Sequence, residues 1–593
     1  MRQYLSKVLY VLSGKRQQLA AMMLLFIFVS ILEVLGIGLI GPFLSIVSDP
    51  SIVKTVPLLG ATVNLLGLES DREIIALSAL LVMGVYSFKS VTYFLCKASI
   101  YRFSYQQKQE LESRLVHTYL NISYLFHLNR NSATLIKNLA IESTQFTVNC
   151  LIPLLEILAN ILVVILLLGL LAVTDVYLVL MVLAVLLPVF LLFARLSRRI
   201  RKWGKTKSKA QANMIRAINH GLGGLKETKV LGCENYFEAD LRQYSRQCAD
   251  ASMRFDSFQL IPRIAIETVL VIFLLMFVLI AQLFLNRSLE ELTAVMGVFA
   301  VASIRMIPAA SQILHAVGRM RSMSYALDML YRDLKEIEHY KMSAGAIAAP
   351  IPSRMATRFD EAVSLQKVTF TYPKADSPAL REISLNIRKG ESIALVGKSG
   401  SGKTTLVDII LGLLQPSSGD ILLDGRSVYQ DLRAWQNLLG YIPQSIFLTD
   451  ETIAQNIAFG VPADEIDYDR VEMAVRAAQL QDLVDNLPEG LGTMVGERGT
   501  RISGGQRQRV GIARALYYGR EILVLDEATS ALDSETEKLV SDAINSLAGN
   551  KTLIIIAHRV STIEHCDRVY RLESGQIQQT GTYQEVVLAG DRR

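Results

Sequence analysis

The segment with the clearest chemical capacity is GKSGSGKTT, which directly follows the apolar stretch Ile393–Val396. Its residues are Gly397, Lys398, Ser399, Gly400, Ser401, Gly402, Lys403, Thr404 and Thr405. The spacing matches G-x-x-x-x-G-K-[ST], in which glycines let backbone N–H groups surround phosphates and the next helix directs its positive end at them. Lys403 would neutralise phosphate charge, and the Thr404 hydroxyl would ligate Mg²⁺. The segment therefore predicts a nucleotide-phosphate site.

A second element, ILVLDE, ends in two adjacent carboxylates, Asp526 and Glu527. The four apolar residues before them predict a buried parallel strand, and ligands gather at the carboxyl ends of such strands. Asp526 is placed to hold Mg²⁺ and Glu527 to polarise an attacking water. Together with the phosphate loop, this element predicts hydrolysis of a nucleoside triphosphate.

A second anion-binding turn lies between these two elements, in the segment ISGGQ that begins at Ile502. It consists of Ser503, Gly504, Gly505 and Gln506. Small residues that open a helix form an N-terminus suited to phosphate. One nucleotide has a single γ-phosphate, so these residues alone leave open what the second turn binds.

The elements that must position these residues follow a small-residue and proline stretch at 344–352. Beyond it, short apolar runs alternate with helical periodicity, which predicts an α/β domain with a largely parallel sheet. We therefore expect a helical domain at 1–342, a linker at 343–360 and the α/β domain at 361–593.

Of all residues in the chain, 51% are apolar and only 20% are charged. The long apolar runs lie in the first half. Each run is near or above the roughly 20 residues that a helix needs to cross a membrane. The predicted transmembrane helices are 19–47, 74–96, 151–173, 176–194, 265–285 and 292–316. The fold class we expect is thus a polytopic membrane domain of six helices followed by a P-loop ATPase domain.

Charge patterning sets the expected orientation. The stretch after the fourth span carries eight cations and no acid: Arg195, Arg198, Arg199, Arg201, Lys202, Lys205, Lys207 and Lys209. A solvated face or a nucleic-acid contact would explain such a run, but its place at a membrane exit favours the positive-inside rule. Both termini and the long segments 97–147 and 195–258 would then be cytoplasmic, and nucleic acid is not expected as a partner. The five scattered cysteines form no C-x-x-C pair.

These motifs together resemble an ATP-binding cassette exporter half-transporter, and the resemblance covers nearly the whole chain. ISGGQ resembles the family signature, with Ile502 in place of leucine. In that family two cassettes pair head to tail, and the signature of one closes on ATP held by the other. The resemblance therefore implies that the second turn acts in trans and that the chain works as a homodimer, or with a heterologous partner.

Further positions match the family residue by residue. Tyr372 resembles the aromatic residue that stacks on adenine, Gln444 the glutamine that senses Mg²⁺ and water, and His558 the switch histidine. Asp533 resembles an aspartate at the cassette contact, acting in trans, and Glu497–Gly499 a segment that contacts the membrane domain's loops. The implied catalytic residues are Glu527, His558 and Gln444, and the implied Mg²⁺ ligands are Thr404, Gln444 and Asp526.

The cargo is predicted from ionisable residues in or near the spans, because such residues usually face a cavity or a partner. The candidates are Glu33, Lys89, Arg263 and Arg305, and a structural role for them stays open. The membrane half also resembles lipid-linked oligosaccharide flippases and related polysaccharide and glycolipid exporters, in LEVLGIGLIGPFL, PRIAIE and FAVASIRMIPA. That resemblance implies ATP-driven flipping of a lipid-linked or amphipathic substrate across a bacterial cytoplasmic membrane.

Alternative functions remain at this point: a multidrug or peptide exporter, or an ATP-gated regulator that transports nothing. In the family, cytoplasmic segments transmit cassette closure to the helices, and 129–143 and 212–229 are the expected coupling elements.

Overall fold

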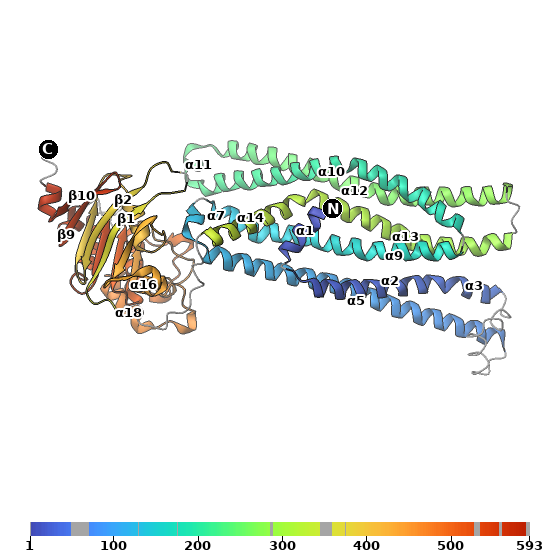
Figure 1. Ribbon diagram of the computed structural model, residues 1–593, viewed down its shortest axis with the longest axis horizontal. Helices are drawn as coiled ribbons and strands as arrows, with labels where there is room; N and C mark the ends of the chain where they lie inside the picture. The colour runs from blue at the N-terminus through green and yellow to red at the C-terminus, as the bar shows by residue number, and fades with distance from the viewer. Residues whose placement is uncertain are drawn as a thin grey trace. The chain divides into compact units, whose positions relative to one another are not determined.

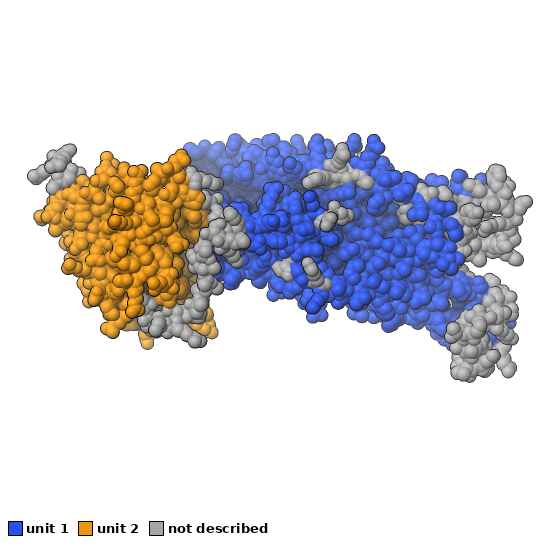
Figure 2. Space-filling model, in the orientation of Figure 1, with its two compact units in different colours: residues 1–122, 130–343 blue, residues 123–129, 344–593 orange. Residues whose placement is uncertain are grey.

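The computed structural model describes residues 2–12, 14–48, 70–128, 130–174, 176–284, 289–343, 358–373, 375–526, 534–556 and 560–588. Two compact units make up the chain, one of residues 1–122 and 130–343 and the other of 123–129 and 344–593 (Figure 2). Three of the expected catalytic or cassette-contact residues, Glu527, Asp533 and His558, lie outside the described residues.

The first unit is helical. Its helices are α1 (Arg2–Val11), α2 (Arg16–Gly38), α3 (Ile40–Ser48), α5 (Asp71–Asn121), α7 (Ser132–Lys137), α8 (Ser143–Phe146), α9 (Ile152–Thr174), α10 (Val176–Gly223), α11 (Leu225–Leu231), α12 (Glu234–Phe284), α13 (Leu289–Ser322) and α14 (Ser324–Ser343), with π-helical turns at Asn138–Glu142 and Thr147–Leu151 (Figure 1).

Several of these helices are much longer than a membrane is thick. Helix α5 has 51 residues, or about 77 Å at 1.5 Å per residue, against roughly 30 Å of hydrocarbon. Its apolar part comes first, and the polar part after residue 96 continues the same helix. Within the described residues, three helical stretches are long and apolar enough to cross a membrane: Gln17–Val47, Asp71–Asn121 and Thr134–Val173. The expected spans at 176–194, 265–285 and 292–316 fall on α10, α12 and α13, except for residue 285.

The helices of this unit meet in an apolar core. Ile37 of α2, Leu167 of α9, Phe193 of α10, Ile266 of α12 and Met306 of α13 belong to one buried cluster. Since these helices are apolar nearly all round in this stretch, the polar side chains placed among them require partners from neighbouring helices.

The second unit contains two sheets. The strands are β1 (Ala362–Phe370), β2 (Leu380–Arg388), β3 (Ser392–Val396), β4 (Ser418–Leu423), β5 (Arg426–Ser427), β6 (Leu439–Ile442), β7 (Ile522–Asp526), β8 (Thr552–Ile556), β9 (Arg568–Glu573) and β10 (Gln576–Gly581). One sheet has the order β2-β1-β4-β5 and is antiparallel. The other has the order β10-β9-β3-β8-β7-β6, in which only β10 is antiparallel to its neighbour.

Helices and short turns connect these strands. They are α6 (Tyr124–Leu128), α15 (Lys403–Ile410), α16 (Leu432–Leu438), α17 (Ile453–Ile457), α18 (Tyr468–Ala477), α19 (Gln481–Asn486), α20 (Gly504–Tyr517), α21 (Ser534–Asn545) and α22 (Val560–Ile563), with 3₁₀ turns at Val428–Gln430, Ala463–Glu465, Gly490–Gly492 and Glu497–Gly499 and a π-helical turn at Gln584–Leu588.

Strands β3 and β7 are buried on both faces. Ala394 and Leu525 belong to one hydrophobic core, whereas Leu395 and Val524 belong to the other. Because successive side chains of a strand point to opposite faces, an unbroken apolar run supplies both cores at once. This burial explains why neither strand shows the alternating pattern of a half-exposed strand.

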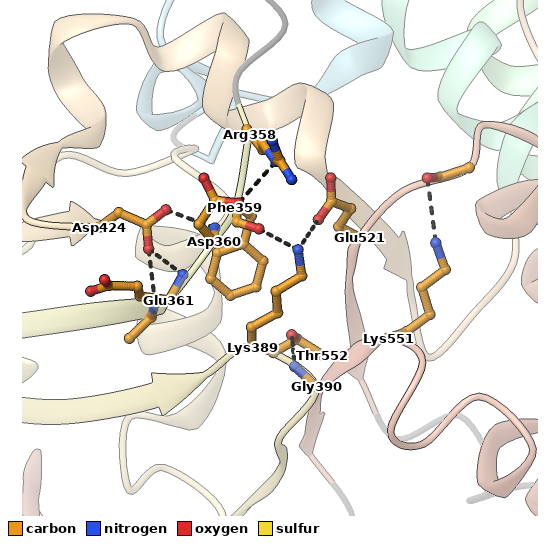
Figure 3. Close-up of polar contacts among 12 residues, drawn as sticks. Arg358, Phe359, Asp360, Glu361, Lys389, Gly390, Asp424, Glu521, Lys551 and Thr552 are labelled. Atoms are coloured by element: carbon orange, nitrogen blue, oxygen red, sulfur yellow. Dashed lines mark hydrogen bonds and ion pairs between the residues drawn. The ribbon is translucent and has the colours of Figure 1, made fainter.

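The start of β1 is tied down by one carboxylate. Asp424 accepts hydrogen bonds from the backbone N–H groups of Asp360, Glu361 and Ala362, at 2.8 to 2.9 Å (Figure 3). Lys389 donates to the carbonyl oxygen of Phe359 and pairs with a carboxylate that precedes β7. The first residues of the unit after the linker are thereby fixed to two turns of the sheets.

Candidate functional site

The phosphate loop leaves β3 through backbone that only glycine adopts readily. Gly397 has φ +155° and Gly402 has φ +104°. A Cβ atom on Gly397 would lie 2.3 Å from the carbonyl oxygen of Leu572, and one on Gly402 would lie 2.9 Å from a methyl carbon of Leu380. The loop therefore requires glycine at both positions for conformational and for steric reasons.

The side chains of the loop are arranged to meet an anion. Lys403, at the start of α15, is 6% exposed and donates to the carbonyl oxygens of Gly397 at 2.7 Å and Lys398 at 3.1 Å. Ser401 Oγ is buried and has no hydrogen-bond partner among the described residues. A phosphate oxygen would satisfy this hydroxyl, and Lys403 would supply positive charge, so these residues fit a nucleotide phosphate.

Tyr372 lies beside the same loop. Its hydroxyl is 3.0 Å from Thr405 Oγ1, and its ring meets Phe370 edge-on with 4.9 Å between ring centroids. The Tyr372 side chain is half-buried, so part of the ring stays accessible. Its place next to the first turn of α15 fits the predicted contact with a nucleotide base.

The carboxyl ends of β3, β6 and β7 bring the other predicted groups to one edge of the sheet. β8 separates β3 from β7, and β6 follows β7, so Asp526 and Gln444 end or follow strands close to the phosphate loop. The Tyr441 hydroxyl donates to Asp526 Oδ2 at 3.5 Å. Burial, and secondly the charge of Asp526, raises the pKa of Asp408 to about 6. Thr404, Gln444 and Asp526 offer the oxygen ligands that Mg²⁺ prefers.

The signature turn begins α20. Ser503 caps the helix by accepting a hydrogen bond from the backbone N–H of Gln506 at 3.2 Å, and the Gln506 side chain accepts one from the Ser503 backbone N–H at 2.8 Å. Ser503 and Gly504 are exposed, whereas Gly505 is buried. The reciprocal cap fixes the turn while it leaves Ser503 and Gly504 accessible.

Sequence reasoning did not single out α6. The segment Ser123–Asn129 belongs to the same compact unit as the ATPase strands, and Leu125 packs against the same hydrophobic core as Tyr372. Burial, and then the charges of Asp408 and Tyr372, raises the pKa of Tyr124. The expected coupling element, 129–143, starts where this segment ends, and residues 130–143 belong to the other unit. The apolar sequence YLFHL, between polar residues, marks a short helix but not the unit against which that helix packs.

Three of the four predicted cargo residues meet in the helical unit. The Glu33 carboxylate of α2 lies 3.1 Å from Lys89 Nζ of α5 and 2.6 Å from Arg305 Nε of α13. Arg263 is not part of this cluster. It is exposed on α12, and no ion pair joins it to any residue in the described part of the chain.

Comparison with known proteins identifies the family of the chain. The ABC transporter family model matches residues 380–530, and the ABC transporter transmembrane region matches residues 19–303. The ATP-dependent lipid A-core flippase of Ralstonia nicotianae is 35% identical, over 67% of this chain and 66% of that protein. The flippase of the same name from Thiobacillus denitrificans is 31% identical, over 87% of this chain and 88% of that protein.

Among solved structures, a bacterial Atm1-family ABC exporter with ATP bound is similar in fold. The TM-score is 0.68 with 23% identity, over 98% of this chain and 97% of that one. The likeness confirms the predicted fold class, an exporter-type helical membrane domain followed by a P-loop ATPase domain. A phosphate loop, a signature turn and a helical membrane unit in one polypeptide, matched over most of the chain by relatives of the same architecture, place this protein in the ABC transporter family.

Proposed function

We propose that this chain uses ATP hydrolysis to flip a lipid with an anionic headgroup, such as a lipid-linked oligosaccharide or a glycolipid, across a bacterial cytoplasmic membrane. The observation that carries the proposal is a phosphate loop with its signature turn on the same chain as a cluster of Lys89 and Arg305 around buried Glu33, among membrane helices. The relatives named as lipid A-core flippases support a phosphorylated glycolipid as the substrate class.

At the nucleotide site, Lys403 and the loop backbone hold the phosphates, and Tyr372 contacts the base. Thr404, Gln444 and Asp526 would hold Mg²⁺, which neutralises phosphate charge when it is bound. Glu527 positions and polarises the attacking water, and His558 contacts the γ-phosphate. These roles follow from the match of each residue to the family pattern and from the accessible strand ends that carry Asp526 and Gln444.

A second copy of the chain completes the site. One chain has one phosphate loop and one signature turn, and exposed Ser503 and Gly504 are free to reach a nucleotide held elsewhere. In the proposed homodimer, each signature turn, together with Asp533, closes on the ATP of its partner. Both termini and the ATPase unit lie in the cytoplasm, as the cations that follow the fourth span indicate.

The proposed flipping follows from the charges of the membrane cluster. One carboxylate and two cations leave a net charge of +1 among apolar helices. Such a charge is costly unless it faces a water-filled cavity or binds an anion. A phosphate or pyrophosphate headgroup carries the charge and the acceptor oxygens that a lysine and an arginine bind well.

The test is ATP-dependent movement of lipid in reconstituted vesicles. Lipid A that has been moved to the vesicle interior becomes protected from an external phosphatase. We expect protection with Mg·ATP, none without ATP, and none in Glu527→Gln, which still binds the nucleotide. An unaltered chain that hydrolyses ATP but moves neither lipid A nor a pyrophosphate-linked oligosaccharide would contradict the proposal.

The same vesicles separate the two alternatives. A drug or peptide exporter would be stimulated by amphipathic solutes and not by phosphorylated lipids. An ATP-gated regulator would move neither class, although ATP would still change its conformation.

A further inference from the structure

A second carboxylate in the membrane unit is held in the same way as Glu33. Glu156 of α9 lies 3.2 Å from Lys97 Nζ and 2.8 Å from Arg319 Nη2. In both clusters the lysine comes from α5 and the arginine from α13. We call Glu33, Lys89 and Arg305 the first triad, and Glu156, Lys97 and Arg319 the second triad.

In the first triad the carboxylate is the innermost group. The Glu33 side chain is 3% exposed, against 15% for Lys89 and 20% for Arg305. Arg305 Nη2 donates to Glu33 Oε2 at 2.7 Å. Arg305 Nε lies 2.6 Å from Glu33 Oε1, so the guanidinium faces both oxygens of the carboxylate. An incoming anion that took the place of this carboxylate would meet two guanidinium N–H groups that already point at an anion.

The second triad repeats this order. Glu156 is 13% exposed, whereas Lys97 is 20% and Arg319 33% exposed. Each carboxylate thus lies behind its two cations, and the cations lie on the more accessible side. An ion pair made only for packing has no need of two cations for each carboxylate, because the second cation adds a desolvation cost.

Tyr93 connects the two triads. Its ring centroid is 4.9 Å from the guanidinium carbon of Arg305 and 6.0 Å from Lys97 Nζ, so these two cations lie within about 11 Å of one another. The Lys89 ammonium lies 4.8 Å from the ring centroid of Tyr86, on the same helix. The result is a continuous series of cations and tyrosine rings along α5 and α13.

We propose that the two triads form a two-step relay for the phosphoryl headgroup of a lipid, in which Glu33 and Glu156 are stand-in anions that the headgroup replaces. The relay rests on the proposed function above. In each triad the carboxylate neutralises one cation while no headgroup is present, and the net charge of +1 remains to attract one. A headgroup bound at Lys97 and Arg319 then exchanges onto Arg305 and Lys89 past Tyr93, and the carboxylate it leaves re-forms its ion pairs.

The order of the steps follows from the positions along the helices. Lys97 and Arg319 lie just beyond the apolar stretches 74–96 and 292–316, on the side proposed to be cytoplasmic, whereas Lys89 and Arg305 lie within them. The second triad therefore loads the headgroup from the cytoplasmic leaflet, and the first triad holds it deeper in the membrane. The roles proposed above for the nucleotide site and for the first triad do not involve the second triad.

The experiment compares two double variants in vesicles of phosphatidylcholine that contain increasing lipid A. Lys97→Gln with Arg319→Gln removes the cations of the second triad, and Lys89→Gln with Arg305→Gln removes those of the first. Lipid-stimulated ATPase activity gives an apparent KM for lipid A, and protection from phosphatase gives the maximal transport rate. Lys108→Gln, which removes an α5 lysine from a half-buried pair with Glu112 outside both triads, is the matched control.

Loss of the loading step should raise the apparent KM about 10-fold or more, because each charged hydrogen bond to the headgroup contributes appreciably to its binding. Loss of the deeper step should lower the maximal transport rate about 10-fold while the KM changes less than about threefold. The charge-conserving pair Lys97→Arg with Arg319→Lys should recover most of the KM, which a loss of fold would not permit.

Two results would overturn the relay alone. The first is a second-triad variant that has the KM and transport of the unaltered chain. The second is a pair of variants that change the same parameter to the same extent. If lipid A and a pyrophosphate-linked oligosaccharide fail to stimulate even the unaltered chain, the proposed function fails as well, and the relay with it.

Discussion

The hydroxyl of Ser401 is the most informative single atom of the nucleotide site, because it is buried without a partner among the described residues. An unsatisfied buried hydroxyl costs roughly 1–3 kcal/mol. This cost is tolerable where a ligand removes it, which is the expectation for a phosphate loop. The unsatisfied hydroxyl thus destabilises the nucleotide-free protein and strengthens the binding of the nucleotide.

Substituting this residue separates the two contributions. We expect Ser401→Ala to leave the melting temperature of the nucleotide-free protein unchanged or to raise it by a few degrees, because the unsatisfied group is gone. The same variant should weaken ATP binding about fivefold, because one hydrogen bond to phosphate is lost. Thermal melting and nucleotide titration measure the two effects, and exposed Ser399→Ala is the control for a neighbouring hydroxyl. A Ser401→Ala protein that is destabilised without ATP would refute this account.

The residues of the site could be predicted only where their chemistry is local. Gly397, Lys403 and Ser503 form sequence patterns whose spacing encodes a turn followed by a helix, and these turns have the expected caps and backbone angles. The pairing of Glu156 with Lys97 and Arg319 could not be predicted in this way, because it joins three helices whose rotation about their axes is set by packing.

At the scale of elements, Asp424 fixes the beginning of β1 by accepting three backbone N–H groups. Burial raises the pKa of this carboxyl, but the hydrogen bonds from Asp360, Ala362 and Glu361, with the charge of Lys389, outweigh burial and lower it overall. A lowered pKa means that the ionised carboxylate stabilises the folded state. This contribution is complete above the ordinary pKa of about 4 and fades as the pH falls through the lowered value.

Asp424→Asn should therefore lower the melting temperature most at neutral pH, by a few degrees at most, because the carboxylate is only half-buried. The difference from the unaltered protein should shrink as the pH falls to about 4 and below. Melting curves between pH 8 and pH 3.5 measure this. Asp360→Asn, which changes an exposed carboxylate nearby, should show no such convergence. A difference that grows toward acid pH would have the wrong sign for this explanation.

Helix α6 is the other element whose role is open to a direct test. Its apolar side chain Leu125 packs against the core of the ATPase unit, and the following residue of the helical unit, Arg130, pairs with Asp333 and Glu336 of α14. The helix is thus fixed to the ATPase unit, while the chain that follows it is fixed to α14. We therefore predict that α6 couples the two units.

Leu125→Asp should weaken this transmission, because a carboxylate cannot be buried in an apolar core without a partner. We expect ATP hydrolysis to persist while its stimulation by lipid A falls about fivefold, since full burial of a leucine contributes roughly 1.5–3 kcal/mol and half-buried Leu125 contributes part of that. ATPase assays with and without lipid A measure the two rates. Leu120→Asp, on an exposed position of α5, is the matched control. Equal stimulation in both variants would exclude α6 as a coupling element.

At the scale of the whole molecule, the sequence predicted the order of the two domains because each is encoded by a strong and different pattern. Apolar runs long enough to cross a membrane mark the first half. Strands that are apolar on both faces, such as Ile393–Val396, mark the second half. The position of α6 could not be predicted, because Ser123–Asn129 lies within the sequence of the helical domain but belongs to the ATPase unit. Contacts between residues far apart in the sequence place this segment in the ATPase unit, and local hydrophobic periodicity does not report such contacts.

The proposed homodimer predicts that two inactive variants recover ATPase activity when they are mixed. Lys403→Ala removes the phosphate lysine and Ser503→Arg blocks the signature turn, so each variant alone should have almost no ATPase activity. A mixed dimer has one defective site that contains both changes. Its other site pairs the intact phosphate loop of the Ser503→Arg chain with the intact signature turn of the Lys403→Ala chain. That site should hydrolyse ATP.

If the copies exchange freely and the sites work independently, an equal mixture should recover about a quarter of the unaltered activity, because half of the dimers are mixed and each has one intact site. Co-expression of the two variants with different tags, followed by ATPase assay, measures this recovery. A chain that carries both substitutions, mixed with Lys403→Ala alone, should recover nothing. Recovery in the first mixture and not in the second requires the signature turn to act on a nucleotide held by the other copy. Inactivity in the first mixture as well would contradict a signature turn that acts on the ATP of the other copy.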